Sequence, residues 1–298
     1  MDTVVVDARL MAYTRFHRGK NILGLTADVA NLISSKVGNG PFRIVFALDY
    51  GKSKRAEFYP QYKEHRKARD KAKGKEYQKK LEIFNTEYNK LKDYLKNFGH
   101  SVAIWGVEAD DIASILAHSS LVKTGKLYLL SSDSDWVKFV KNPNTYIINP
   151  TKNLLVSYSS LKEVYGYTAY EKLVMDCLIG VPKENVPGLR RFGPKTFFKI
   201  LEEVGGDLGE VLGKVESIYN GSNKIPEPFS TVREMYDFNV KLFKPWTIND
   251  LTDEEQKLLF EALEEKPFKN IEKIYNDSVT MFGSLYLPTS VEEKVYGL

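Results

Sequence analysis

The chain has 298 residues, of which 43% are hydrophobic and 28% charged, and these proportions are typical of a globular protein with one large or two modest domains. No apolar run approaches the length of a membrane span, the first residues enter a predicted strand without room for a signal peptide, and the single cysteine, Cys177, excludes an internal disulfide framework. We therefore expect a cytoplasmic protein without membrane contact, with a monomer as the default state.

Four short apolar runs predict buried strands. They span residues 3–6, 44–48, 102–105 and 127–130. Long connections separate them, and two of these connections contain helical apolar patterns, at 25–36 and 77–98. Because parallel strands need such crossovers, the pattern predicts an α/β fold with a mostly parallel sheet flanked by helices.

Acidic residues follow each of these runs. The carboxyl ends of parallel strands lie along one edge of the sheet, where open α/β folds bind their ligands. Crowded carboxylates raise one another's pKa, and a divalent cation relieves the repulsion. For the stretch 108–111 alone, an acidic first helical turn is an equally good interpretation. Repetition at four strand ends favours a site for Mg²⁺, with Mn²⁺ as a substitute. The seven carboxylates are Asp7, Asp49, Glu108, Asp110, Asp111, Asp133 and Asp135.

The connection after the second strand begins with a basic segment. Residues 52–80 hold twelve Lys and Arg against four Asp and Glu, although the whole chain has a net charge of only +4. Cations neutralise phosphates and aromatic rings stack on unpaired bases, so the segment suits single-stranded or distorted nucleic acid. A solvated charged loop is the alternative. The cations and rings are Lys52, Lys54, Arg55, Lys63, Arg66, Lys67 and Arg69, with Phe58, Tyr59 and Tyr62.

A second informative stretch covers residues 185–204, NVPGLRRFGPKTFFKILEEV. It resembles the nucleotide-binding pattern G-x-x-x-x-G-K-[ST], but Pro194 precedes the lysine, so we expect no nucleotide cradle. A helix-hairpin-helix turn fits better, because its glycines permit tight turns and Pro194 suits the first turn of a helix. Such a turn binds a DNA phosphate without reading bases, while a simple connector is the alternative. The residues expected at the phosphate are Gly188, Gly193, Lys195 and Thr196.

A resemblance to the 5′ nuclease superfamily rests on six segments in chain order: VVVD, FALDYGKSKR, YPQYKEHR, GVEADD, SSDSDW and NVPGLRRFGPKT. This superfamily contains flap endonucleases, bacteriophage 5′→3′ exonucleases and RNase H, and the 5′-nuclease domain of bacterial DNA polymerase I. The resemblance implies a PIN-like core at 1–165, with a helical arch in the segment 50–99. It also implies a helical DNA-binding region at 166–298, with a helix-three-turn-helix motif at 185–204. The small size suggests a phage or bacterial form. If the protein comes from a phage, its expected location is the cytoplasm of the host.

The same resemblance implies roles for single residues. Lys63 and Arg66 match catalytic cations that engage the scissile phosphate, and Arg55 and Tyr62 match residues that bind the threaded 5′ strand. The hairpin residues match those that hold duplex DNA, often through a monovalent cation such as K⁺. Of the acidic residues, Asp7, Asp49, Glu108 and Asp110 match the first metal site, and Asp111, Asp133 and Asp135 match the second site or its surroundings.

One departure concerns the second metal site. The superfamily pattern G-D-x-x-D-N has Val181 in place of its first aspartate, Glu184 in place of its second, and Lys183 beside it. We therefore expect a weakened or rearranged second site, in which Glu184 reaches the ion with its longer side chain or a water intervenes.

The resemblance implies phosphodiester hydrolysis near 5′ ends in DNA replication or repair, such as primer removal. Flaps, overhangs and nicked duplexes are the expected substrates, together with RNA–DNA hybrids. Because of Val181, a catalytically weak or inactive structure-specific DNA-binding protein is the main alternative. A PIN-type ribonuclease acting on RNA alone is a second alternative, which the hairpin disfavours.

Overall fold

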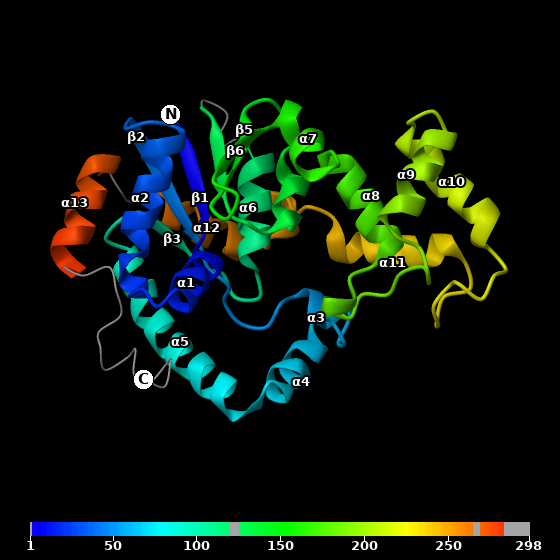
Figure 1. Ribbon diagram of the computed structural model, residues 1–298, viewed down its shortest axis with the longest axis horizontal. Helices are drawn as coiled ribbons and strands as arrows, with labels where there is room; N and C mark the ends of the chain where they lie inside the picture. The colour runs from blue at the N-terminus through cyan, green and yellow to red at the C-terminus, as the bar shows by residue number, and fades with distance from the viewer. Residues whose placement is uncertain (1, 120–124, 265–268, 283–298) are drawn as a thin grey trace. The chain divides into compact units, whose positions relative to one another are not determined.

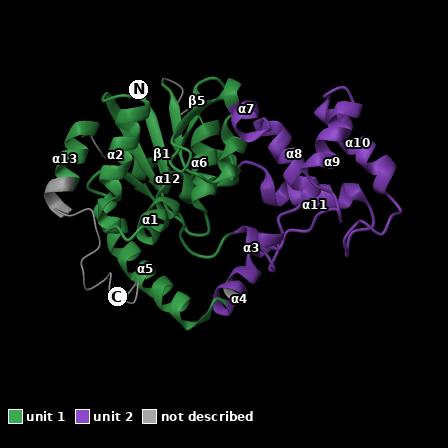
Figure 2. Ribbon diagram, viewed as in Figure 1, with its two compact units in different colours: residues 1–53, 73–160, 246–298 green, residues 54–72, 161–245 purple. Residues whose placement is uncertain are grey.

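The computed structural model describes residues 2–119, 125–264 and 269–282. The chain divides into two compact units, coloured separately in Figure 2. Unit 1 comprises Met1–Ser53, Lys73–Ser160 and Trp246–Leu298, and unit 2 comprises Lys54–Ala72 and Leu161–Pro245. Among the described helices, none combines the length and the apolar composition needed to cross a bilayer.

Unit 1 is built on a mostly parallel sheet with the strand order β3-β2-β1-β4-β5-β6 (Figure 1). The first five of these strands pair in parallel, while β6 is antiparallel to β5 and the short β7 pairs with β2. The predicted α/β fold class is therefore confirmed. The strands are β1 Thr3–Asp7, β2 Pro41–Ala47, β3 His100–Val102, β4 Leu127–Leu130, β5 Thr145–Asn149, β6 Leu154–Ser157 and β7 Lys269–Asn270.

Helices of unit 1 cover this sheet and bury its apolar side chains. The largest cluster joins Val4 and Val6 of β1 with Phe16, Phe84 and Leu91 from the helices. Burying such side chains is the main favourable term in folding. The α-helices are α1 Ala8–His17, α2 Leu25–Lys36, α5 Gly74–Leu95, α6 Ala109–His118, α12 Asp253–Glu264 and α13 Ile271–Phe282. The 3₁₀ turns are η1 Ile22–Gly24, η3 Ser134–Phe139, η4 Tyr158–Ser160 and η6 Ile248–Asp250.

Unit 2 is helical and has a core of its own. Leu178, Phe197, Val211, Val215 and Met235 meet in its largest apolar cluster. Its elements are α3 Arg55–Phe58, α4 Glu64–Ala72, α7 Leu161–Tyr165, α8 Ala169–Ile179, η5 Pro182–Glu184, α9 Pro194–Glu203, α10 Leu208–Tyr219 and α11 Val232–Phe243.

The division into units differs from the expected domains in three places, of which the smallest is Leu161–Tyr165, a segment that belongs to unit 2. The segment 54–72 belongs to unit 2, because the backbone N–H of Lys63 donates to the carbonyl oxygen of Glu184 at 2.8 Å and the Tyr59 hydroxyl donates to that of Asn185 at 2.9 Å. The segment 246–298 belongs to unit 1, where α12 packs against β3 and β7 pairs with β2. The two larger differences depend on contacts between residues far apart in the sequence.

The structure also differs from the sequence analysis in three local features. The strand predicted at 102–105 ends at Val102, where the carbonyl accepts the last ladder bond from Leu48 at 3.0 Å. Part of the basic segment that could have been a charged loop forms α3 and α4. The strands β5 and β6 were not predicted at all.

Candidate active site at the carboxyl edge of the sheet

Asp7 ends β1 and begins the site. Its Oδ1 accepts a hydrogen bond from the backbone N–H of Leu10 at 3.0 Å, which caps α1, and its Oδ2 accepts one from the Ser131 hydroxyl at 3.1 Å. The side chain is buried, and burial is the largest cause that raises the pKa of Asp7 to about 7. The negative charges of Asp49 and Asp133 raise it further, whereas the two hydrogen bonds act in the opposite direction. Carboxylates that follow β1, β2 and β4 therefore repel one another at this edge.

Asp49 connects the end of β2 to the first turn of α6. Its Oδ1 accepts a hydrogen bond from the backbone N–H of Ala109 at 2.9 Å. Glu108 is the N-cap of this helix, and its own N–H donates to Oδ2 of Asp111 at 3.0 Å. Asp111 is buried, so the structure gives its carboxylate a capping role in the helix. The positive end of the helix dipole helps to hold these acids at one place.

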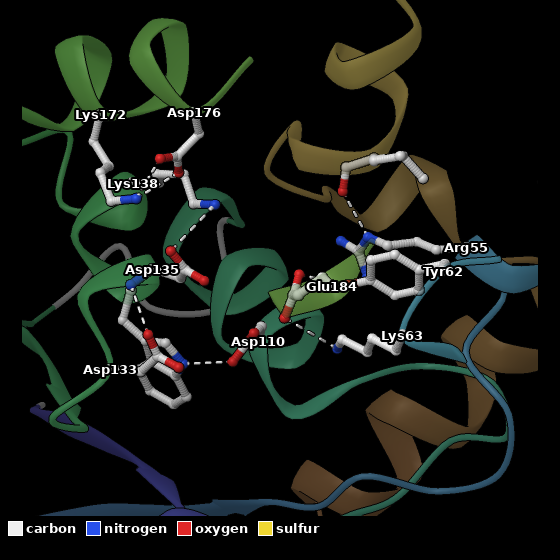
Figure 3. Close-up of polar contacts among 12 residues, drawn as sticks. Arg55, Tyr62, Lys63, Asp110, Asp133, Asp135, Lys138, Lys172, Asp176 and Glu184 are labelled. Atoms are coloured by element: carbon white, nitrogen blue, oxygen red, sulfur yellow. Dashed lines mark hydrogen bonds and ion pairs between the residues drawn. The ribbon is translucent and has the colours of Figure 1, made fainter. Parts of the chain in front are cut away.

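Asp110 lies beside the segment that follows β4. The indole N–H of Trp136 donates to Oδ1 of Asp110 at 2.6 Å, and Figure 3 shows this contact. Asp133 Oδ1 accepts from the backbone N–H of Asp135 at 3.0 Å, which shapes the turn into η3. Asp135 also faces a cation, because its Oδ1 lies 4.0 Å from Nζ of Lys138.

The chemistry of this edge fits a hydrated divalent cation. Every acidic group offers carboxylate oxygen, the donor that Mg²⁺ prefers, and a bound cation would remove the repulsion that Asp7 experiences. The buried hydroxyl of Tyr88 has no hydrogen-bond partner among the described residues, and its pKa is raised by burial and then by the charges of Asp49 and Asp7. In the described part of the chain, no three His, Cys, Asp or Glu side chains are arranged to hold one ion by themselves. Mg²⁺ usually keeps several of its waters.

The expected catalytic cations lie in unit 2, where they surround Glu184. Nη2 of Arg66 lies 2.7 Å from Oε1 of Glu184, and Nζ of Lys63 lies 3.9 Å from the same oxygen. The hydroxyl of Tyr62 donates to Oε2 at 3.3 Å (Figure 3). Nε of Arg55, the fourth expected residue of this segment, donates to the carbonyl oxygen of Leu242 at 2.7 Å. The neighbours of Glu184 in unit 2 are therefore cations and a hydroxyl, which differs from the acidic surroundings expected of a metal ligand.

Val181 also has a role in the packing of unit 2. Its backbone forms an antiparallel bridge with Val186, through N–O distances of 3.0 and 3.1 Å. Its side chain packs against a cluster that contains Cys177 and Leu242. An aspartate at this position would place a carboxylate against apolar groups, which is unfavourable.

The expected hairpin precedes α9 in unit 2. Gly188 is required for close packing, because a Cβ there would lie 1.9 Å from the carbonyl oxygen of Ile179. Gly193 is the N-cap of α9 and Pro194 occupies its first turn. The exposed Lys195 and the neighbouring Thr196 follow in that turn, where N–H groups have no intrahelical partner. These residues suit an anion.

Sequence reasoning missed three residues that shape the carboxyl edge. Ser131 and Trp136 hold Asp7 and Asp110, and both stand within a few residues of the acids after β4, which is a signal that could have been used. The ring of Tyr88 lies beneath the guanidinium of Arg9, 5.2 Å from its centroid. Tyr88 comes from α5, whose pattern shows only amphipathic packing, so the sequence offers no signal for it, whereas Arg9 stands two residues after Asp7 and is expected near this edge.

Comparison with known proteins identifies the family. The model of the family described as 5′-3′ exonuclease, N-terminal resolvase-like domain, matches residues 2–166. A 5′-3′ exonuclease of Buchnera aphidicola subsp. Schizaphis graminum is 24% identical over 243 residues, which cover 77% of each chain. A 5′-3′ exonuclease of Aquifex aeolicus is 28% identical over 210 residues, covering 70% of this chain and 65% of the relative. The DNA polymerase I of Pseudomonas aeruginosa is 27% identical over 75% of this chain, which spans 24% of that protein.

Solved structures show the same fold. The T5 5′-exonuclease with bound zinc has a TM-score of 0.66 at 17% identity, covering 94% of this chain and 99% of that one. The bacteriophage T5 flap endonuclease in a pseudo-enzyme–product complex with DNA and metal ions has a TM-score of 0.65 at 17% identity, with the same coverage. Since the family model matches more than half of the residues, the chain belongs to the 5′-3′ exonuclease family with an N-terminal resolvase-like domain.

Proposed function

We propose that this protein is a divalent-metal-dependent 5′ nuclease that hydrolyses phosphodiester bonds near the 5′ ends of structured DNA, as a 5′→3′ exonuclease and flap endonuclease. Removal of primers, including the RNA of RNA–DNA hybrids, in replication or repair is the role that suits this activity. The observation that carries the proposal is the placement of acids at the ends of neighbouring strands, where the buried Asp7 is held by Leu10 and Ser131 and its pKa is raised by burial and by the charges of Asp49 and Asp133.

The carboxylates of unit 1 are the proposed metal ligands. When bound, two divalent ions, Mg²⁺ or Mn²⁺, would supply the positive charge that activates the attacking water and stabilises the leaving oxygen. The chain's own part is to hold its carboxylates at one edge through the contacts with Leu10, Ser131, Ala109 and Trp136. The ligands proposed for the first ion are Asp7, Asp49, Glu108 and Asp110, and those for the second ion or its surroundings are Asp111, Asp133 and Asp135.

Unit 2 is proposed to bind the nucleic acid. Lys63 and Arg66 would offset charge that develops on the phosphate, as preorganised cations do. Tyr62 and Arg55 would contact the 5′ strand, and the hairpin would hold the duplex through its phosphates, with K⁺ as a candidate ion. Recognition would then depend on the shape of the junction and on salt, and very little on base sequence. The hairpin residues are Gly188, Gly193, Lys195 and Thr196.

Cleavage of a labelled 5′-flap duplex in Mg²⁺ and in Mn²⁺ tests the proposal. We expect native protein to release short 5′ products, and Asp49→Asn and Glu108→Gln to lose at least a hundredfold in rate while retaining flap binding. Asp93→Asn is the matched control, because this exposed acid on α5 forms its ion pair with Lys96, the residue that caps the end of the same helix. Binding by native protein without any product in either metal would favour the DNA-binding alternative.

A further inference from the structure

Two exposed aromatic side chains of unit 1 stand in the chain within three residues of proposed metal ligands. Tyr50 is 50% exposed and Trp105 is 63% exposed. Their ring centroids are 5.2 Å apart and their planes are nearly perpendicular, at 89°. Large aromatic side chains usually lose most of their exposed area on folding. We refer to this pair as the aromatic ledge.

The ledge is held in place by its backbone. The N–H of Gly106, the residue after Trp105, donates to the carbonyl oxygen of Tyr50 at 2.8 Å. Gly51, the residue after Tyr50, has a φ of +80°, and a Cβ there would lie 2.7 Å from the Trp105 ring. The indole therefore lies directly on the glycine backbone. A flexible surface ring would not need such a close fit.

The loops that carry the ledge also carry two of the proposed metal ligands. Tyr50 follows Asp49 directly, and Trp105 stands three residues before Glu108. Oδ1 of Asp49 accepts a hydrogen bond from the N–H of Ala109, which joins the two loops a second time. The ledge and these carboxylates therefore belong to the same pair of joined loops.

No polar contact of the two rings within the described residues explains why they are held at the surface. In the described part of the chain, neither the Tyr50 hydroxyl nor the Trp105 indole N–H takes part in a hydrogen bond. An aromatic face adds no positive charge, so it can attract a base without competing with the cations that the carboxylates require. Stacking on aromatic side chains suits every base, because each base has a π-face.

We propose that Tyr50 and Trp105 form a stacking site for one unpaired nucleobase of the substrate, adjacent to the bond that is cleaved. This inference rests on the proposed nuclease function, because it is the phosphate at the carboxylates that brings a base to the ledge. The site positions the substrate and tolerates any base.

Tryptophan fluorescence gives a direct test of stacking. Trp136 and Trp246 are buried, so Trp105 is the exposed indole of the three. In Mg²⁺, a 5′-overhang duplex with a non-hydrolysable linkage at the scissile position should quench the fluorescence of native protein, and Trp105→Phe should abolish the quenching while binding normally. Quenching that persists in Trp105→Phe would contradict the proposal.

An abasic substrate tests the contact itself. Placing an abasic residue beside the scissile bond should weaken binding by native protein about tenfold, as loss of one stacked base does. Trp105→Ala should weaken binding of the intact substrate by a similar factor and should not distinguish it from the abasic one. Tyr94→Ala removes another exposed aromatic ring of unit 1 and is the control. Its affinity for each of the two substrates should equal that of native protein. Equal affinities of native protein for the intact and the abasic substrate would overturn the stacking site.

These binding measurements separate the inference from the proposed function. If native protein cleaves the flap in Mg²⁺ but shows no coupling between Trp105 and the base, the stacking site is wrong and the nuclease stands. If the coupling is present and no cleavage occurs in Mg²⁺ or Mn²⁺, the stacking site stands and the nuclease is wrong.

Discussion

The guanidinium of Arg66 lies 2.7 Å from Oε1 of Glu184, and both groups belong to unit 2. Glu184 is only 8% exposed, and the nearby Lys63 and Tyr62 complete its surroundings. A buried carboxylate needs such partners, because removing them would leave its charge uncompensated. Glu184 thus pairs with Arg66 and Lys63, the cations that are expected to bind a phosphate. A phosphate would have to compete with Glu184 for them.

Glu184→Gln distinguishes this pairing from a metal ligand. Since the change frees a cation, the logarithm of DNA affinity should fall more steeply with the logarithm of salt concentration, by about 0.9 in slope for each additional phosphate contact. The Mn²⁺ concentration that gives half-maximal cleavage should stay unchanged. Glu210→Gln, an exposed acid on α10, serves as control. A strong shift to higher Mn²⁺ concentration would instead identify Glu184 as a ligand.

The raised pKa of Asp7 predicts how stability depends on pH in EDTA. Its pKa is about 7 in the folded protein, against an ordinary value of 3.8, with burial as the largest cause. Between these values the folded state holds a proton that the unfolded state releases, so the free energy of unfolding falls as pH rises. At pH 8 the cost is about 4 kcal/mol at most. Asp7→Asn should therefore be more stable than native protein at pH 8 and lose this advantage near pH 4.

Divalent metal should reduce or reverse the stability advantage of Asp7→Asn over native protein at pH 8. Mg²⁺ or Mn²⁺ at pH 8 should raise the melting temperature of native protein, because a ligand that binds only the folded state stabilises it. Asp7→Asn should gain much less, and Asp93→Asn should gain as much as native protein. Equal gains in all three proteins would remove Asp7 from the proposed ligands.

The sequence predicts the elements whose signals are local. Helix α2 occupies the expected residues 25–36, and the acids after β1, β2 and β4 follow from apolar runs that end in carboxylates. The pairing of Arg66 with Glu184 joins residues 118 positions apart, so no local pattern contains it. The capping contact of Asp111 is different, because a glutamate followed three residues later by another acid is a local signal. The assignment of Asp111 to the surroundings of the second metal ion stays a prediction beside this capping role.

Trp136→Phe tests the hydrogen bond to Asp110. The indole is fully buried, so the smaller ring should lower the free energy of unfolding by about 1–3 kcal/mol, through a cavity and a lost bond. The rate of cleavage should also fall, because Asp110 loses the donor that holds it. Trp246→Phe, at another buried tryptophan of unit 1, should lower stability without lowering the rate. Denaturant unfolding and turnover at saturating substrate measure the two effects, and an equal loss of rate in both variants would show that the Asp110 contact is structural only.

Lys195→Ala examines the hairpin as a phosphate site. Lys195 is exposed in the first turn of α9, where its charge adds to the helix dipole. The change should weaken binding of all duplexes alike and reduce the salt slope by about 0.9, since one phosphate contact is lost. Lys214→Ala is the control, because Lys214 already pairs with Glu203 at 3.6 Å within unit 2. Fluorescence anisotropy between 50 and 200 mM salt distinguishes the two variants, and identical slopes would mean that Lys195 does not contact the DNA.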